Sequence, residues 1–349
     1  MLRDSSSLIS KKNPSTSHSD APHLWQDAKI SLLPTPNLNF ADESTARHSL
    51  RDYFLNTFDS YELLFDCLKN PEGYYLKPIS LRHPLIFYLG HTATFFINKL
   101  LLSKLISARL NPQLESIFAV GVDEMSWDDL NDQHYEWPSV AEVRVYRHQV
   151  RALILNLIEH APLTLPLNWH NPWWSILMGI EHERIHLETS SVLIRQQQLE
   201  HVQNHPQWRA NIITGIAPEN TLIAVPEGQV SLNKSLDSCF YGWDNEYGQH
   251  QAEVASFAAS QYLVSNQEFL SFVEDNGYST DRYWTEEGLA WLQFTQVKHP
   301  SFWRKTALGW SLRIMLEEIP MPWDWPVEVN YHEAKAFCNW KAQKTGQSI

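Results

Sequence analysis

Apolar residues recur every three or four positions in the first half of the chain, a pattern that predicts long helices with one buried face. The first helix follows a cap at Asp42 or Ser44 and runs to about residue 68. The second follows His83. Pro84 takes its first helical position, where proline has no hydrogen bond to lose.

Two more helices complete this pattern. Ser139 and Glu142 form a capping box that opens a helix ending near residue 160. Asn171 and Pro172 open another that runs to about residue 198. Four long helices joined by loops predict an antiparallel four-helix bundle.

The pattern changes after about residue 220, where short β-rich pieces alternate with turns and short helices. The elements expected there are strands at Leu222–Val225, 229–232 and 262–264, a helix over 266–275, and a helix to about residue 344 opened by the capping box of Asn330 and Glu333. The predicted fold class is therefore α+β, with a helical bundle followed by a mixed second domain.

These changes predict the domain limits. We expect a flexible tail over 1–40, which is rich in Ser and Pro, a bundle over 41–205, a linker over 206–220 and a second domain over 221–349. Gly346 ends the last predicted helix, and no strand follows it. We therefore expect the second domain to be incomplete at its C-terminal end.

Composition narrows the function classes. The net charge of −13 argues against non-specific nucleic-acid binding, because phosphate binding needs a basic face. Three widely spaced cysteines without CxxC spacing, and a start without an apolar signal, favour a reducing compartment, so we expect a cytoplasmic location. The apolar stretch 84–106 is interrupted by polar residues, which favours a buried helix over a membrane span.

The residues with the clearest chemistry lie in the fourth helix. His182 and His186 are one turn apart on one helix face, so their imidazoles could hold one metal ion. His91, in the apolar second helix, is the candidate third ligand, because a buried imidazole needs a partner. A chain with 16 histidines can also show this spacing by chance, so the pattern alone leaves a structural role open.

The same segment matches H-E-x-x-H, the zinc-peptidase signature, in which Glu183 would be the general base. The continuation of that signature is missing, because Thr189 and the residues after it supply neither the glycine nor the third histidine. Glu200 is a poor downstream ligand, since it lies in a very polar run. The sequence therefore disfavours a peptidase.

The histidine segments and parts of the second half of the chain resemble a known family. His182, His186 and Glu188, preceded by Gly90-His91, resemble the DinB-like iron domain of the sulfoxide synthases of ergothioneine and ovothiol biosynthesis. Segments that resemble the formylglycine-generating-enzyme (sulfatase-modifying) domain joined to it are 241–246, 262–270 and 326–340. Segments that look most like the ovothiol branch, the histidyl-cysteine sulfoxide synthases, are 82–99, 118–130 and 178–191.

The resemblance covers about residues 40–349 and implies a DinB-like bundle followed by a partial C-type-lectin-like domain. It implies a mononuclear Fe(II) site formed by His91, His182 and His186, with an open side for substrates and O2. Cysteine, histidine and O2 are the implied small-molecule partners. The implied reaction joins the thiol sulfur to the imidazole and oxidises that sulfur to a sulfoxide.

Further site residues follow less directly. Glu188 points away from the histidine face and is predicted to support the ligands rather than bind the metal. The residues predicted to hold the substrate's amine and carboxylate are Asp123, Asp128, Arg144 and Arg147. In the family a catalytic tyrosine and the imidazole pocket lie later in the second domain, so this chain is expected to bind iron and to lack turnover.

Three alternatives remain open. An ergothioneine-type synthase would use trimethylhistidine in place of histidine. A DinB-like module could bind metal without oxygenase chemistry, and a non-catalytic interaction fragment is a third reading. Metal identity and O2 uptake separate these functions.

Overall fold

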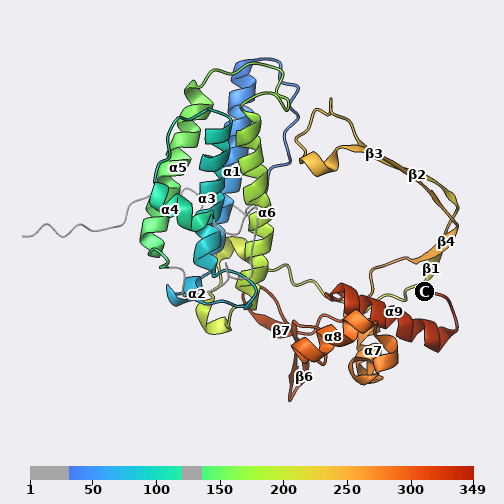
Figure 1. Ribbon diagram of the computed structural model, residues 1–349. Coiled ribbons are helices and arrows are strands. Elements are labelled where there is room, and N and C mark those ends of the chain that lie inside the picture. The colour runs from blue at the N-terminus through green and yellow to red at the C-terminus, as the bar shows by residue number, and fades with distance from the viewer. Residues whose placement is uncertain (1–30, 120–135) are drawn as a thin grey trace, which may run out of the picture.

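Four helices packed side by side form the first part of the chain (Figure 1). The computed structural model describes residues 31–119 and 136–349. The bundle helices are α1 (Glu43–Phe65), α3 (Leu85–Leu102), α5 (Val140–His160) and α6 (Trp174–Gln196). Two short helices lie in the connections, α2 (Glu72–Tyr75) and α4 (Pro112–Phe118). The predicted four-helix bundle is confirmed.

The helix starts follow the sequence closely. Asp42 caps α1 by accepting a hydrogen bond from the Thr45 N–H, and Ser139 and Glu142 form the predicted capping box of α5. Pro84 lies one position earlier than predicted, as the cap residue of α3 rather than its first helical residue.

The middle helix α3 is the core of the bundle. It packs against α5 and α6 and is buried on nearly all sides. Within the described residues it is the helix long and apolar enough to cross a membrane, yet 78% of that window is buried inside the protein. The prediction of a buried helix there is confirmed. Polar side chains in so apolar a helix need internal partners.

The segment before α1 packs against the bundle. Leu38 is buried, and its N–H donates to the carbonyl oxygen of Cys239 at 2.7 Å. The Leu33 carbonyl accepts a hydrogen bond from Arg184 at 2.6 Å. Residues 31–40, part of the tail predicted over 1–40, thus include positions that bond to the folded chain.

The second part of the chain combines small sheets with short helices. Its antiparallel pairs are β1 (Leu222–Val225) with β4 (Phe257–Ser260) and β2 (Gly228–Lys234) with β3 (Gly248–Val254). A three-stranded sheet contains β5 (Trp303–Thr306), β6 (Gly309–Arg313) and β7 (Glu318–Pro320). The helices are α7 (Asn266–Glu274), α8 (Glu286–Thr295) and α9 (Tyr331–Thr345). Single 3-10 turns occur at Leu199–His201, Pro206–Trp208, Asp244–Glu246, Gly277–Ser279 and Asp281–Tyr283.

Most of the predicted elements in this part are present. The strand Leu222–Val225 and the capping box of Asn330 and Glu333 are confirmed. The strand predicted at 262–264 is wrong, since no strand forms there and β4 ends at Ser260. Those apolar residues instead lead into α7, and Ser265 makes only an isolated bridge to Pro326.

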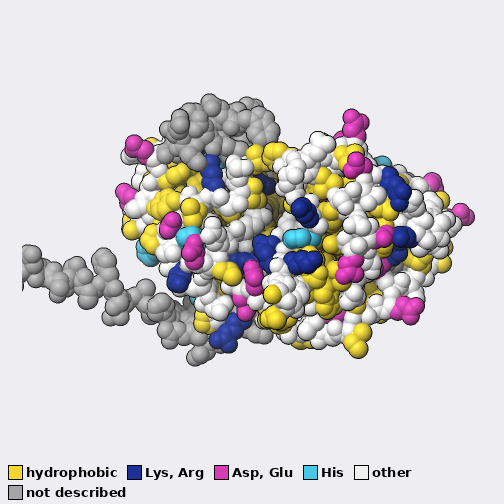
Figure 2. All heavy atoms as spheres, turned by 90° about the horizontal axis from the view of Figure 1, so that it is seen from below, with side chains coloured by type: hydrophobic (Ala, Val, Ile, Leu, Met, Phe, Trp, Pro, Cys, Tyr) yellow, Lys and Arg dark blue, Asp and Glu magenta, His cyan; other side chains and the backbone are white. Residues whose placement is uncertain are grey.

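The two parts of the chain touch at both ends of α6. At its start, the ring of Trp174 packs on Tyr241, which lies between β2 and β3. At its end, Arg195 forms two hydrogen bonds of 2.7 Å with the Glu328 carboxylate and a third with the Arg313 carbonyl oxygen. Figure 2 shows the molecule from below as two lobes with basic side chains gathered along their seam.

Candidate metal centre

Three histidines from two helices meet inside the bundle. His91 lies on α3, whereas His182 and His186 lie one turn apart on α6, the helix packed against it. Their ring centroids are 4.5–5.0 Å apart. One ligand nitrogen from each ring can be chosen so that all three lie within 4.8 Å of one another. The structure thus brings together the three residues predicted as metal ligands.

The backbone at the end of α4 sets the tautomer of His91. Its Nδ1 lies 2.9 Å from the carbonyl oxygen of Phe118, which can only accept a hydrogen bond. Nδ1 therefore carries the proton, and the lone pair of the neutral ring is on Nε2. Metal-binding histidines typically donate their second ring nitrogen in this way, because the bond fixes the ring and raises its basicity.

Two phenylalanine rings stack on the imidazoles. Phe95 stacks on His182 with ring centroids 3.6 Å apart, and Phe87 stacks on His91 at 5.1 Å. The buried Nδ1 of His182 has no hydrogen-bond partner among the described residues. A buried polar atom without a partner lowers the free energy of unfolding, and a bound ion or ligand could offset that loss.

Their surroundings favour the neutral form of His182 and His186. Burial lowers the pKa of His182 well below its usual value, and electrostatic interaction with His186, His91 and Lys99 lowers it further. Burial, with His91 and Arg82, lowers the pKa of His186 to about 3. A neutral imidazole is the form that binds a metal, because it keeps a lone pair. The donor set therefore fits a divalent transition metal.

Glu183 faces a buried cation and not the histidines. It is fully buried on α6, and its Oε1 accepts hydrogen bonds from Arg147 at 2.9 Å and from Thr92 at 3.1 Å. A peptidase base would need to face bound water at the metal. The peptidase reading is disfavoured again, here by the direction of this carboxylate.

Arg147 lies in the core of the bundle and bonds to groups of the protein itself. Its guanidinium is buried and bonds to Glu62, Glu183, Thr92 and the Leu89 carbonyl oxygen. Binding a substrate carboxylate, as predicted from the sequence, would require these bonds to break. No local sequence signal indicated that this arginine lies in the core.

The other predicted site residues lie apart from the histidines or outside the described residues. Arg144 is partly exposed and bonds to Glu62, Asp66 and Tyr74. Glu188 is exposed, and no hydrogen bond or ion pair joins its carboxylate to the imidazoles in the described part of the chain. Asp123 and Asp128 lie outside the described residues.

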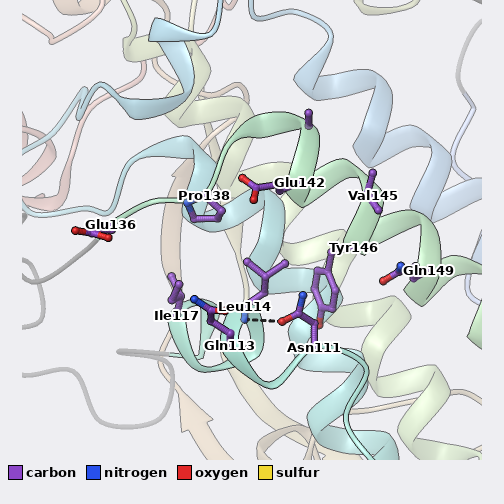
Figure 3. A pocket seen from close by; sticks show the side chains of 11 residues that line it. Asn111, Gln113, Leu114, Ile117, Glu136, Pro138, Glu142, Val145, Tyr146 and Gln149 are labelled. Atoms are coloured by element: carbon purple, nitrogen blue, oxygen red, sulfur yellow. Dashed lines mark hydrogen bonds between the residues drawn. The ribbon is translucent and has the colours of Figure 1, made fainter. Parts of the chain in front are cut away.

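Two cavities lie near this region. One of about 290 Å³ is lined by His91 and by residues further along α3. The other, of about 500 Å³, lies between α4 and the first turns of α5, where Asn111, Tyr146 and Gln149 line it (Figure 3). None of the three histidines lines the larger cavity. The smaller cavity is therefore the one that adjoins the candidate metal centre.

Sequence reasoning missed the residues that hold the ligands. Phe95 and Thr92 are buried beside His182 and Glu183, and the carbonyl of Phe118 orients His91. Phe95 follows His91 by one helical turn, so its spacing was a usable signal. The Phe118 carbonyl left no signal, since any residue type has one.

Gly90 allows Phe118 to approach the metal centre, so Gly90→Ala is a local test. A Cβ at this position would lie 2.4 Å from the ring of Phe118, which is fully buried. We expect a loss of about 1–3 kcal/mol in unfolding free energy from overpacking. We also expect metal affinity to fall about tenfold, because the carbonyl that orients His91 moves with Phe118.

The control is Gly277→Ala, which creates a similar contact at 2.3 Å with Phe272 in the second part of the chain. Urea unfolding should show a comparable loss for both variants, whereas metal titration should show a change for Gly90→Ala alone. Unchanged metal affinity in Gly90→Ala would contradict the role given to the Phe118 carbonyl.

Two family profiles match this chain. The DinB superfamily profile matches residues 53–190, which include all three histidines. The sulfatase-modifying factor enzyme 1-like domain profile matches residues 214–344. The chain thus joins a DinB superfamily domain to a sulfatase-modifying factor enzyme 1-like domain. This confirms the two-domain organisation that the resemblance implied.

Curated relatives carry related names. Ergothioneine biosynthesis protein 1 of Neurospora crassa is 28% identical over 213 residues, which cover 56% of this chain and 24% of the relative. Hercynine oxygenase of Mycolicibacterium smegmatis is 29% identical over 218 residues, covering 60% of this chain and 46% of the relative. The same-named protein of Mycobacterium tuberculosis is 35% identical over 98 residues, 28% of this chain and 23% of the relative. The match thus spans less than half the length of each of these relatives.

Proposed function

We propose that this DinB–FGE protein acts in a non-haem Fe(II), O2-dependent sulfoxide synthase reaction that joins cysteine sulfur to the imidazole of histidine. The observation that carries the proposal is the set of three imidazoles whose ligand nitrogens lie within 4.8 Å of one another. Iron is the metal proposed, because imidazole suits it and because O2 chemistry needs a redox metal.

The reaction balances without a further reductant. The thiol loses its hydrogen, the imidazole carbon loses its hydrogen, and a C–S bond forms between them. One oxygen atom of O2 becomes the sulfoxide oxygen and the other leaves as water with the two hydrogens. A bound Fe(II) would supply the activation of O2 and a common site for both substrates.

The residues of the chain have separate tasks in this proposal. His91, His182 and His186 would hold the metal from two helices. The Phe118 carbonyl keeps the lone pair of His91 on Nε2. Phe95 and Phe87 shield two of the rings, which lowers the local dielectric and strengthens binding of anionic sulfur. A reducing, cytoplasmic setting would keep the thiol substrate available.

The substrate branch is the finer part of the proposal. The likeness of segments 82–99, 118–130 and 178–191 to histidyl-cysteine sulfoxide synthases favours histidine as the acceptor and ovothiol biosynthesis as the pathway. Relatives named hercynine oxygenase support the alternative acceptor hercynine, the trimethylated form of histidine. The two acceptors differ in charge and bulk at the amino group, so a direct comparison separates them.

The proposal is tested by metal titration followed by O2 consumption. The protein is loaded anaerobically with Fe(II), and O2 uptake is recorded with cysteine plus either histidine or hercynine. We expect one Fe(II) per chain. Because residues 1–349 are expected to bind iron without turnover, a product is expected only from a protein that also contains the imidazole pocket. That product contains one oxygen more and two hydrogens fewer than the two substrates together, which mass spectrometry detects.

Other outcomes point elsewhere. Faster turnover with hercynine would replace the histidine branch by the ergothioneine branch. Zinc bound tightly with no O2 uptake by any substrate pair would contradict the synthase proposal and favour a DinB-like metal-binding module.

A further inference from the structure

One face of α3 connects the metal centre with a cation. His91, Phe95, Asn98 and Lys99 recur at intervals of three and four residues, so they share a face of the helix. All four line the cavity of about 290 Å³. None of the described residues lining this cavity is acidic, and Arg109 adds a second basic group. The cavity next to the histidines is therefore basic.

The ammonium of Lys99 lies close to the histidines and has no anionic partner among the described residues. Its Nζ is 4.8 Å from the centroid of the Phe95 ring, and the same ring stacks on His182 at 3.6 Å. The side chain of Lys99 is half-buried, yet no ion pair is formed by it within residues 31–119 and 136–349. A partly desolvated cation gains strongly from a bound anion.

Asn98 supplies a second donor next to this cation. Its side-chain oxygen accepts a hydrogen bond from Arg109 at 2.9 Å, so the amide is held in one orientation. Arg109 is in turn paired with Glu115 at 3.0 Å. The NH2 group of Asn98 has no acceptor among the described residues, and it can therefore donate to a ligand in the cavity.

We propose that the Lys99 ammonium and the Asn98 amide bind the carboxylate of an amino-acid substrate whose side chain reaches the metal centre. The inference rests on the proposed function and extends it to a carboxylate subsite. Lys99 lies eight positions after His91, which corresponds to about 12 Å of helix. The lysine folds back over Phe95, so the remaining span suits a small amino acid.

The test compares ligands with and without the carboxylate. Cysteine and cysteamine form one pair, and histidine and histamine form the other, so the two pairs identify which substrate carries the bound carboxylate. Anaerobic spectral titrations of Co(II)-loaded protein measure the four affinities. We expect Lys99→Met to weaken binding of one carboxylate ligand about 10- to 100-fold and to leave its decarboxylated analogue unchanged. Lys99→Arg should recover part of the loss.

The control is Lys104→Met, the same substitution just after α3 at an exposed residue that does not line the cavity. It should leave all four affinities unchanged, and thermal melting should show that both variants fold. A separate titration with metal alone tests the metal site. If no metal binds, calorimetric titration of the metal-free protein with the same four ligands still tests the carboxylate subsite. Equal affinities for wild type and Lys99→Met in both forms would overturn the carboxylate subsite and leave the metal proposal standing.

Discussion

Replacing Arg147 by methionine is expected to lower the unfolding free energy by about 3–5 kcal/mol, which would leave little of a typical domain's stability. The guanidinium is buried between α1, α3 and α6, where it bonds to Glu62, Glu183 and the Leu89 carbonyl oxygen. It also lies 4.3 Å from the centroid of the Phe58 ring. Without it, the fully buried Glu183 carboxylate has lost its counter-charge, and that penalty exceeds the value of the bonds themselves. Urea unfolding followed by circular dichroism measures the loss.

Two comparisons make this prediction specific. Arg144→Met removes a neighbouring arginine that is 35% exposed and bonded to Glu62 and Asp66, and it should cost less than about 1 kcal/mol. Adding Glu183→Met to Arg147→Met removes both buried charges and should restore part of the stability. Similar losses for the two arginine variants would show that Arg147 is not the central cation of the bundle.

His182→Ala is expected to reduce Fe(II) affinity by at least about 100-fold, more than changes to residues that only support a ligand. The remaining pair, His91 and His186, would offer two nitrogens on different helices, and two imidazoles bind a divalent ion far less tightly than three. Anaerobic titration against a competing chelator measures the dissociation constant. The variant should stay folded, because the lost ring contacts mainly Phe95 and the other histidines.

The matched control is His201→Ala. This imidazole is also buried in the first part of the chain, but it interacts with Asn70 and Glu200. Its loss should change stability and leave Fe(II) affinity as in the wild type. An equal loss of affinity in both variants would indicate a general effect of removing a histidine and would contradict the assigned ligand set.

The sequence predicted the bundle because its signals are local. Helical spacing and capping residues are read within a few positions, and Asp42 and Ser139 cap the helices they were expected to cap. The histidine pair on α6 is equally local. The third ligand, His91, rested on its apolar surroundings and on the family resemblance, since spacing alone does not connect distant helices.

Features that depend on tertiary contacts were harder to read. A charged residue such as Arg147 on a helix is usually exposed. Only the packing of α1, α3 and α6 around it makes it a buried cation. Strand β3 (Gly248–Val254) is largely exposed and rich in polar residues, so it carries no alternating pattern. The apolar run at 262–264 suggested a strand, but apolar residues also occur where a turn leads into a helix.

The positions of the three histidines along the chain connect metal binding to folding. In the unfolded chain only His182 and His186 are near each other, so a metal ion meets at most a weak two-imidazole site. The third nitrogen arrives when α3 docks on α6, so an ion held by all three imidazoles would bind the folded state selectively. Such selective binding raises the midpoint of thermal unfolding with the logarithm of free metal concentration. The ion would thus act as a reversible cross-link between α3 and α6, and a chelator would lower the melting temperature without altering a single covalent bond.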